Sequence, residues 1–200
     1  MAVIFTDSMG ASANNGWTGY SIRQLIPKAA LTNPGFNTGS IRASFLTAAT
    51  AGPMNIDAMW IGPSITSPVY DYDGTQVRLT FGGANFINGL GASSTTVSDF
   101  IPFTFNFASA IGILICFHLS GTSANLAQGT DVSGSADYYQ LVATGPEGTT
   151  APSGTWTLDA SPALIGINEI DFSAPGQITA VAHGAVMATT QPRGIVPLYG

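Results

Sequence analysis

The amino-acid sequence predicts an all-β protein, an antiparallel β-sandwich of jelly-roll type with extended terminal arms. Three observations lead to this fold class. Apolar residues recur at every second position in several segments, which is the period of a half-buried strand. The 24 glycines and 12 prolines interrupt nearly every window of helical length. The strand patterns also follow one another without the alternating helices of an α/β fold.

The expected strands are short and closely spaced. In the clearest of them, Ile101, Phe103, Phe105 and Phe107 alternate with other residues, so the large side chains share one face. Clusters of glycine, proline, asparagine and serine between the strands are typical of turns. In chain order, the nine expected strands are Ser40–Leu46, Met54–Trp60, Val77–Phe81, Ile101–Phe107, Ile111–Leu119, Tyr138–Ala143, Thr155–Leu158, Ile167–Phe172 and Ile178–Val186.

The segments between these strands set the domain boundaries. The best helical window is Tyr20–Ala30, and Pro27 within it disfavours a helix. Two segments of small residues, Gly121–Gly134 and Thr144–Gly154, are expected to be loops, which commonly carry binding surfaces. We therefore expect an N-terminal arm and connecting segment (1–38), a β-sandwich (39–190) and an extended C-terminal tail (191–200).

Charge is scarce in this protein. Only 8% of its residues are charged, whereas ordinary soluble domains have roughly a quarter. The formal net charge is -6, and no basic residue occurs between Leu79 and Pro192. A neutral surface of small residues suits a part packed into an assembly, because few charges repel a neighbouring protein. Nucleic acid is not an expected partner, since its recognition depends on clustered lysine and arginine.

The N-terminal residues and the longest apolar run of the sequence indicate where the protein is expected to be located. No basic segment precedes Asp7, so we expect no signal peptide and synthesis in a host cytoplasm. The longest near-apolar run, Ala108–Leu119, is shorter than the roughly 20 residues that span a bilayer, and we expect no membrane insertion. The single cysteine, Cys116, cannot form an intrachain disulfide and is expected to be a small core residue.

Two motifs could carry catalysis, and for each we favour a structural interpretation. Residues Val3–Gly10 resemble the first block of the SGNH hydrolases, in which Ser8 would be the nucleophile of an esterase. Thr6 replaces the glycine of that family, and His183 lacks the aspartate that should precede it. Cys116 and His118 share one face of an apolar strand, where a thiol and a neutral histidine are usually core residues. We expect no enzymatic activity.

The segment Asp71-Tyr72-Asp73-Gly74-Thr75 has two interpretations. We favour an Asp-Gly turn, in which Gly74 adopts a positive φ and Asp73 caps its own backbone. In the alternative, Asp71 and Asp73 supply oxygen ligands to a calcium ion. Further ligands would then have to come from other loops, so the expected state is a protein without a cofactor.

Tyrosines near the expected turns offer a binding surface. Tyr70, Tyr72 and Tyr138 are the candidates for exposed rings. Aromatic faces stack on the apolar faces of sugars, and neighbouring neutral side chains can bind the hydroxyl groups. A carbohydrate-binding β-sandwich module is therefore the alternative function.

From Asn55 to Gly121 the sequence resembles a β-sandwich module of tailed-bacteriophage virion proteins, of the tail-fibre, baseplate or capsid-accessory type. The residues that carry the resemblance are Met59-Trp60-Ile61-Gly62, Val69–Thr75, Val77–Gly83, Val97–Phe100 and Ile115–Gly121. The resemblance implies a non-enzymatic structural or adhesive role in a virion. It also implies a homo-oligomer that contacts other virion proteins and, in the adhesive case, a glycan on the host surface.

The basic residues lie mainly in the first part of the sequence. Arg23, Lys28 and Arg42 are therefore the expected assembly contacts, and we expect them to meet an acidic neighbouring protein.

Overall fold

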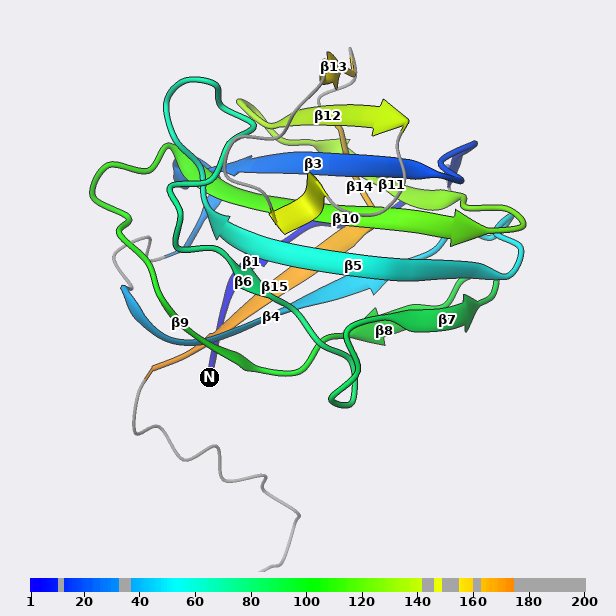
Figure 1. Cartoon of the computed structure of the whole chain (residues 1–200), viewed down its shortest axis with the longest axis horizontal. Helices are drawn as coiled ribbons and strands as arrows, with labels where there is room; N and C mark the ends of the chain where they lie inside the picture. The colour runs from blue at the N-terminus through cyan, green and yellow to red at the C-terminus, as the bar shows by residue number, and fades with distance from the viewer. Residues whose placement is uncertain (11–12, 33–36, 142–145, 149–154, 160–162, 175–200) are drawn as a thin grey trace, which may run out of the picture.

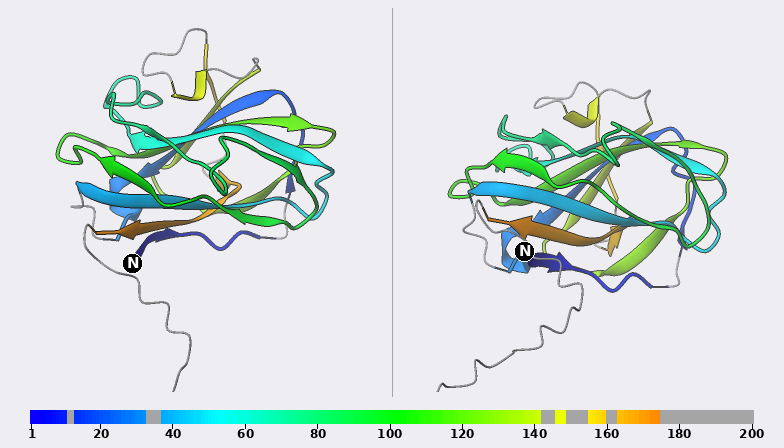
Figure 2. Two further views of the ribbon diagram at one scale, coloured as in Figure 1. Left: turned by 60° about the horizontal axis from the view of Figure 1, so that its bottom comes forward. Right: turned by 90° about the horizontal axis from the view of Figure 1, so that it is seen from below.

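The computed structural model describes residues 1–10, 13–32, 37–141, 146–148, 155–159 and 163–174. Over these residues the protein is an antiparallel β-sandwich, as the sequence predicts. Two large sheets face each other as separate layers (Figure 1, Figure 2). The jelly-roll connectivity stays a prediction.

The front layer in Figure 1 is a seven-stranded sheet. Its order is β13-β12-β3-β10-β5-β6, and β7 also pairs with β5. The strands are β3 (Tyr20–Pro27), β5 (Met54–Pro63), β6 (Val77–Arg78), β7 (Ile87–Leu90), β10 (Gly112–Gly121), β12 (Ala136–Leu141) and β13 (Thr157–Leu158).

The second layer is a five-stranded sheet in the order β1-β15-β4-β8, with β9 also pairing with β4. A three-stranded sheet, β14-β11-β2, completes the strand structure. The strands are β1 (Ala2–Thr6), β2 (Ala13–Asn14), β4 (Thr38–Leu46), β8 (Thr95–Val97), β9 (Ile101–Thr104), β11 (Leu126–Asp131), β14 (Ala163–Ile165) and β15 (Ile167–Ser173). Two short 3-10 helices are η1 (Lys28–Ala30) and η2 (Pro146–Gly148).

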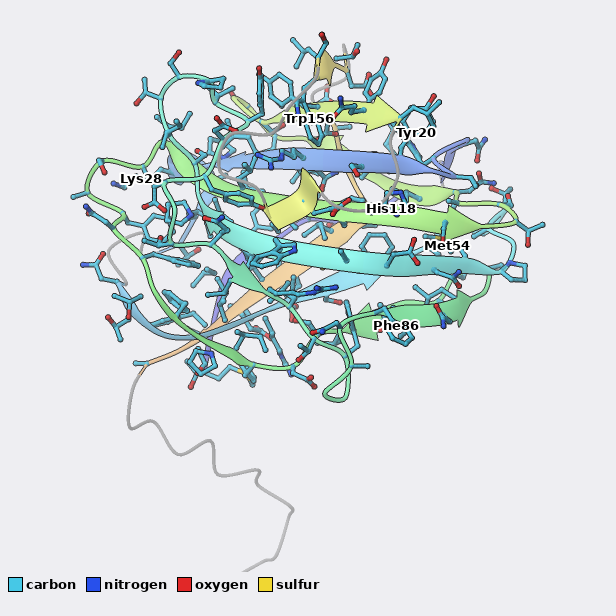
Figure 3. The ribbon with its side chains drawn as sticks, in the orientation of Figure 1. Tyr20, Lys28, Met54, Phe86, His118 and Trp156 are labelled. Atoms are coloured by element: carbon cyan, nitrogen blue, oxygen red, sulfur yellow. The ribbon has the colours of Figure 1, made fainter. Side chains whose placement is uncertain are left out.

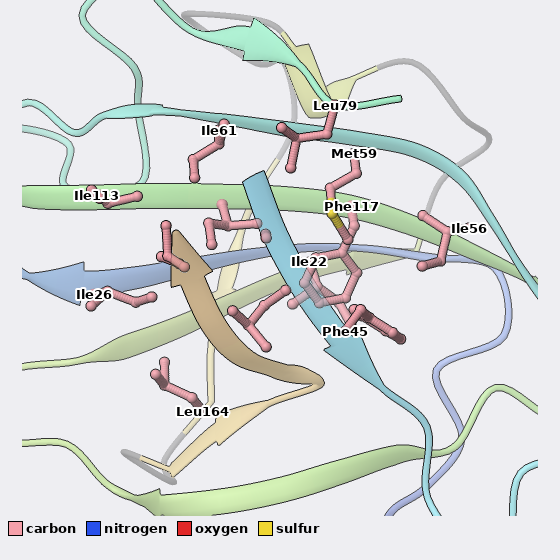
Figure 4. Packing of buried hydrophobic residues seen from close by; sticks show 14 of the residues in the cluster. Ile22, Ile26, Phe45, Ile56, Met59, Ile61, Leu79, Ile113, Phe117 and Leu164 are labelled. Carbon is pink, nitrogen blue, oxygen red and sulfur yellow. The ribbon is translucent and has the colours of Figure 1, made fainter. Parts of the chain in front are cut away.

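The central strand β10 is buried on both faces. Ile113, Ile115 and Phe117 point into the main core between the two large sheets, where they meet residues such as Phe45 (Figure 4). The alternate residues Leu114 and Cys116 belong to a second apolar cluster on the outer face of the sheet. A strand covered on both sides has no solvated face, so its sequence is a nearly continuous apolar run.

The structure corrects the expected N-terminal arm. Before residue 39, the sequence supplies β1, which pairs with β15, and β3, which lies between β10 and β12. Ile22 and Ile26 of β3 are fully buried in the main core. The helical window Tyr20–Ala30 is therefore a strand followed by η1. Ile22 and Ile26 face the main core and Leu25 faces the second cluster, as the alternating faces of a strand require.

The expected loop Gly121–Gly134 is also corrected, because it contains β11. Leu126 and Ala127 of this strand are buried, and its small residues allow close packing against other segments. The expected strand Ile178–Val186 and the C-terminal tail 191–200 lie outside the described residues. Within the described part, neither helical segment has the length and apolar character needed to cross a membrane.

Candidate functional site

The outer face of the seven-stranded sheet carries a second core of its own. Its buried members are Leu25, Tyr72, Leu114, Cys116 and Trp156. The segment between β5 and β6 lies over this face together with η2, and Figure 3 labels Trp156 close to β12 at one edge of the sheet. This face is the candidate site, because most of the sequence-predicted residues meet there.

Arg23 is the centre of the site. Its side chain is fully buried, and its Nη1 donates hydrogen bonds to the Tyr70 carbonyl and to Asp71 Oδ1, the latter at 3.3 Å. Its guanidinium lies 5.0 Å from the ring centre of Tyr72 and 5.0 Å from that of Trp156. Two aromatic faces and a carboxylate thus replace the water that a buried cation loses. We call Arg23, Tyr70, Asp71, Tyr72, Tyr138 and Trp156 the arginine–aromatic cluster.

The aromatic rings of this cluster form a continuous group. The centres of the Tyr70 and Tyr138 rings are 5.0 Å apart, and the Tyr70 ring stacks on Trp156 at 6.3 Å. Tyr70 and Tyr138 are half-buried, whereas Trp156 is almost fully buried. Burial, followed by the neighbouring Tyr70, raises the pKa of Tyr138. The two tyrosines are therefore partly accessible from solvent, and Tyr138 is neutral at physiological pH.

Tyr72 is not the exposed ring that the sequence suggests. It is fully buried, and its hydroxyl donates a hydrogen bond to the Trp60 carbonyl at 3.3 Å. Tyr72 belongs to the covering segment, and its ring packs onto the outer face of the sheet with Leu114 and Cys116; burial raises its pKa. Of the three tyrosine candidates, Tyr70 and Tyr138 are the two that solvent reaches.

The carboxylates proposed for calcium have different partners. Asp71 faces Arg23, and burial raises its pKa while the positive charge of Arg23 opposes that shift. Asp73 accepts hydrogen bonds from the backbone and hydroxyl of Thr75, and Gly74 has φ 99°. The favoured interpretation, an Asp-Gly turn, is confirmed. Among the described residues, no group of three histidine, cysteine, aspartate or glutamate side chains could hold a metal ion.

The three expected assembly cations all contact residues of their own protein. Arg23 is fully buried, which contradicts its expected role as an exposed contact. Lys28 donates to the Phe107 carbonyl from a half-buried position. Arg42 pairs with Asp171 at 2.7 Å and lies over the Phe100 ring, with 29% of its side chain exposed.

A short segment around η2 lies across the site. Glu147 is buried and accepts a hydrogen bond from Ser21 Oγ at 2.6 Å. Gln76 donates to the Gly148 carbonyl, and a Cβ on Gly148 would lie only 2.4 Å from the Trp60 ring. Glycine is therefore required for this close approach. Neither Glu147 nor Trp156 could be assigned to the site from the sequence, because the segments they contact are far away along the sequence.

Cys116 and His118 behave as structural residues of β10. Burial raises the pKa of the Cys116 thiol far above its usual range. His118 Nδ1 lies 2.8 Å from Asp57 Oδ2, and Ser120 Oγ donates to the other oxygen of that carboxylate. Sequence reasoning did not single out Asp57, whose pairing with His118 depends on the register between β5 and β10.

The esterase motif lies elsewhere. Ser8 is exposed after β1, and the neighbouring Asp7 carboxylate accepts hydrogen bonds from the backbone and hydroxyl of Thr130. No described histidine is hydrogen-bonded to Ser8, and His183 lies outside the described residues.

Comparison with known proteins does not identify this protein, since neither a protein-family model nor a curated protein matches it.

Proposed function

We propose that this is a non-enzymatic structural protein of a tailed-bacteriophage virion, located at the tail tip or fibre or on the capsid surface. It acts by contact with copies of itself and with other virion proteins, and in the adhesive case with the host surface. The sequence resemblance over Asn55–Gly121 motivates this choice of particle.

The observation that carries the proposal is the distribution of charge over the sandwich. Arg23, Lys28, Arg42 and Arg78 all donate to partners within their own protein. The described surface therefore presents mainly neutral residues and acids. Small neutral residues lose little side-chain entropy at an interface, and they have no charge to desolvate.

Exposed apolar side chains supply contact area for such an assembly. Interfaces between protein subunits bury side chains of this kind, at about 25 cal/mol for each Å² of apolar surface removed from water. The large hydrophobic side chains that are most exposed in the described structure are Met1, Val3, Phe86, Val97, Leu141 and Leu158.

Light scattering on the purified full-length protein over a concentration range tests self-association, and antibody labelling of phage particles tests location. We expect an oligomer, and labelling of the tail or the capsid surface. Aspartate substitutions at Val97, Leu141 or Leu158 identify the interface by lowering the oligomer mass, with Thr104→Asp as the control for added charge. A protein that stays monomeric at every concentration and binds no particle component contradicts the proposal.

The second candidate is a carbohydrate-binding module, favoured by the partly accessible pair Tyr70 and Tyr138. A glycan array followed by thermal unfolding with each hit tests it, because a ligand that binds only the native state raises stability by mass action. Tyr138→Ala should abolish the shift, and Phe86→Ala, at an exposed ring elsewhere, should not. A silent array removes this candidate, and an unfolding temperature unchanged by EDTA removes its calcium-dependent form.

A further inference from the structure

The sequence contains two asparagine–glycine pairs, Asn15–Gly16 and Asn88–Gly89. Such pairs are prone to spontaneous deamidation, because glycine has no Cβ to hinder the reaction. The backbone nitrogen of glycine attacks Cγ of the preceding asparagine, the bond between Cγ and Nδ2 of that asparagine breaks, and ammonia leaves. Water then opens the cyclic imide to aspartate or isoaspartate, which adds one negative charge.

Both pairs are accessible to water in the folded protein. Asn15 and Gly16 directly follow β2, and Asn88 and Gly89 lie within the short strand β7. All four residues are exposed, so water can reach the reacting groups. The two glycines have positive φ, 91° at Gly16 after β2 and 73° at Gly89, where the pairing of β7 with β5 is irregular. Burial therefore does not protect either pair.

The same contact recurs at both pairs. The Gly16 amide donates to Asn125 Oδ1 at 3.2 Å, and the Gly89 amide donates to Asn55 Oδ1 at 3.0 Å. These acceptors come from segments 109 and 34 residues away. In each pair, the nitrogen that would attack has its proton held by an asparagine from another part of the sandwich.

Other hydrogen bonds fix the two acceptor side chains. Asn125 Nδ2 donates to the Thr50 carbonyl at 3.0 Å. Asn55 Nδ2 donates to Ser120 Oγ at 3.1 Å, and Ser120 Oγ donates in turn to Asp57. An amide group with both ends engaged keeps its orientation, so its oxygen stays directed at the glycine N–H.

We propose that Asn125 and Asn55 are protecting residues that suppress deamidation of Asn15 and Asn88 in the folded protein. The attack needs a nitrogen that has lost its proton and has turned toward the asparagine Cγ. The hydrogen bond retains the proton on the nitrogen and holds the peptide plane away from that geometry. The two asparagine–glycine pairs thus keep their charge for as long as the tertiary contacts last.

The test is an incubation of the full-length protein at mildly alkaline pH, with peptide mapping by mass spectrometry at both sites. We expect Asn55→Ala to accelerate deamidation at Asn88 alone, and Asn125→Ala to accelerate it at Asn15 alone. A rate increase of about five-fold corresponds to one net hydrogen bond of about 1 kcal/mol. Asn125→Asp, which retains an acceptor oxygen, should stay near the wild-type rate.

Asn106→Ala is the matched control, because Asn106 Oδ1 accepts a hydrogen bond from the backbone N–H of Ala108 at 3.2 Å, whereas the N–H groups of Gly16 and Gly89 donate to Asn125 and Asn55. It should leave both rates unchanged. The proposal is overturned if the Asn55→Ala and Asn125→Ala variants deamidate at the wild-type rate. It is also overturned if either variant shows an equal rate increase at Asn15 and at Asn88. If a variant does not fold, the deamidation rates of the wild-type protein are measured in urea and under native conditions. Equal rates in the unfolded and native states overturn the proposal.

Discussion

Arg23→Met removes the charge at the centre of the arginine–aromatic cluster and replaces the arginine with a shorter, unbranched apolar side chain. The native side chain is fully buried, and its guanidinium lies 5.0 Å from the ring centres of Tyr72 and Trp156 and beside Asp71. Methionine can fill much of the same space, so the variant tests the charge and its hydrogen bonds more than the packing.

The expected loss follows from the contacts of the guanidinium. The Tyr70 carbonyl, which is part-buried, loses a charged donor, and an unsatisfied group of this kind costs up to about 1–3 kcal/mol. Two desolvated cation–π contacts contribute roughly 1 kcal/mol each. Asp71 also loses its cation, and breaking a buried pair from one side typically costs about 3–5 kcal/mol. Because these values overlap, we expect a total loss of about 3–5 kcal/mol.

Urea unfolding followed by tryptophan fluorescence measures this loss. Arg42→Met is the control, because the Arg42–Asp171 pair is partly exposed and surface pairs contribute about 0–1 kcal/mol. In the double variant Arg23→Met with Asp71→Asn, part of the loss should be recovered, since no unpaired carboxylate is left. A cost below about 1 kcal/mol for Arg23→Met, or one no larger than for Arg42→Met, would refute the assigned role of Arg23.

Three further predictions concern single ionisable groups. Hydrogen bonds from Thr80, Gly83 and Gly82 lower the pKa of Asp99. The ionised carboxylate therefore stabilises the native state at neutral pH, and this stabilisation is lost as the pH falls below about 4. Asp99→Asn should lower the urea midpoint at neutral pH, and the difference in midpoint between variant and wild type should shrink in acid. Burial and then Asp159 raise the pKa of Asp137 well above its usual value, so its ionisation opposes folding as the pH rises above about 4. Asp137→Asn should accordingly stabilise the protein at neutral pH. A loss of stability at that pH would contradict the upward direction of the pKa shift at Asp137. Because burial raises the pKa of Cys116, the native thiol should not react with a thiol reagent until urea unfolds the protein, and rapid labelling of folded protein would show that the outer face is open.

Much of the strand structure could be predicted because its signal is local. Successive side chains of a strand point to opposite faces, so the alternation around Met54–Trp60 was sufficient to indicate β5. The turn at Asp73–Gly74 was equally predictable, since its chemistry lies within a few residues. β3 was missed as part of the sandwich because both of its faces are buried, and the preceding glycine-rich segment suggested an arm.

The site could be predicted in part. The sequence indicates separate roles for residues that the structure brings into one cluster, namely Arg23, Tyr70, Asp71 and Tyr138. Their residue types indicate aromatic and polar interactions, but the type of a residue alone does not reveal whether its side chain is buried. Arg23 illustrates the difficulty, because arginine is almost never fully buried unless it is paired.

The sequence by itself determined that this is an antiparallel β-sandwich with a central apolar strand at β10. It also determined that the surface carries little charge, with more acidic than basic residues. These properties depend on backbone geometry, side-chain period and composition, which act over a few residues. Only the tertiary structure decided that β10 has a second core on its outer face and that Arg23 is its centre. The reason is that Arg23 and its partners Tyr70 and Asp71 are 47 and 48 residues apart, so their meeting depends on how distant segments pack over one sheet.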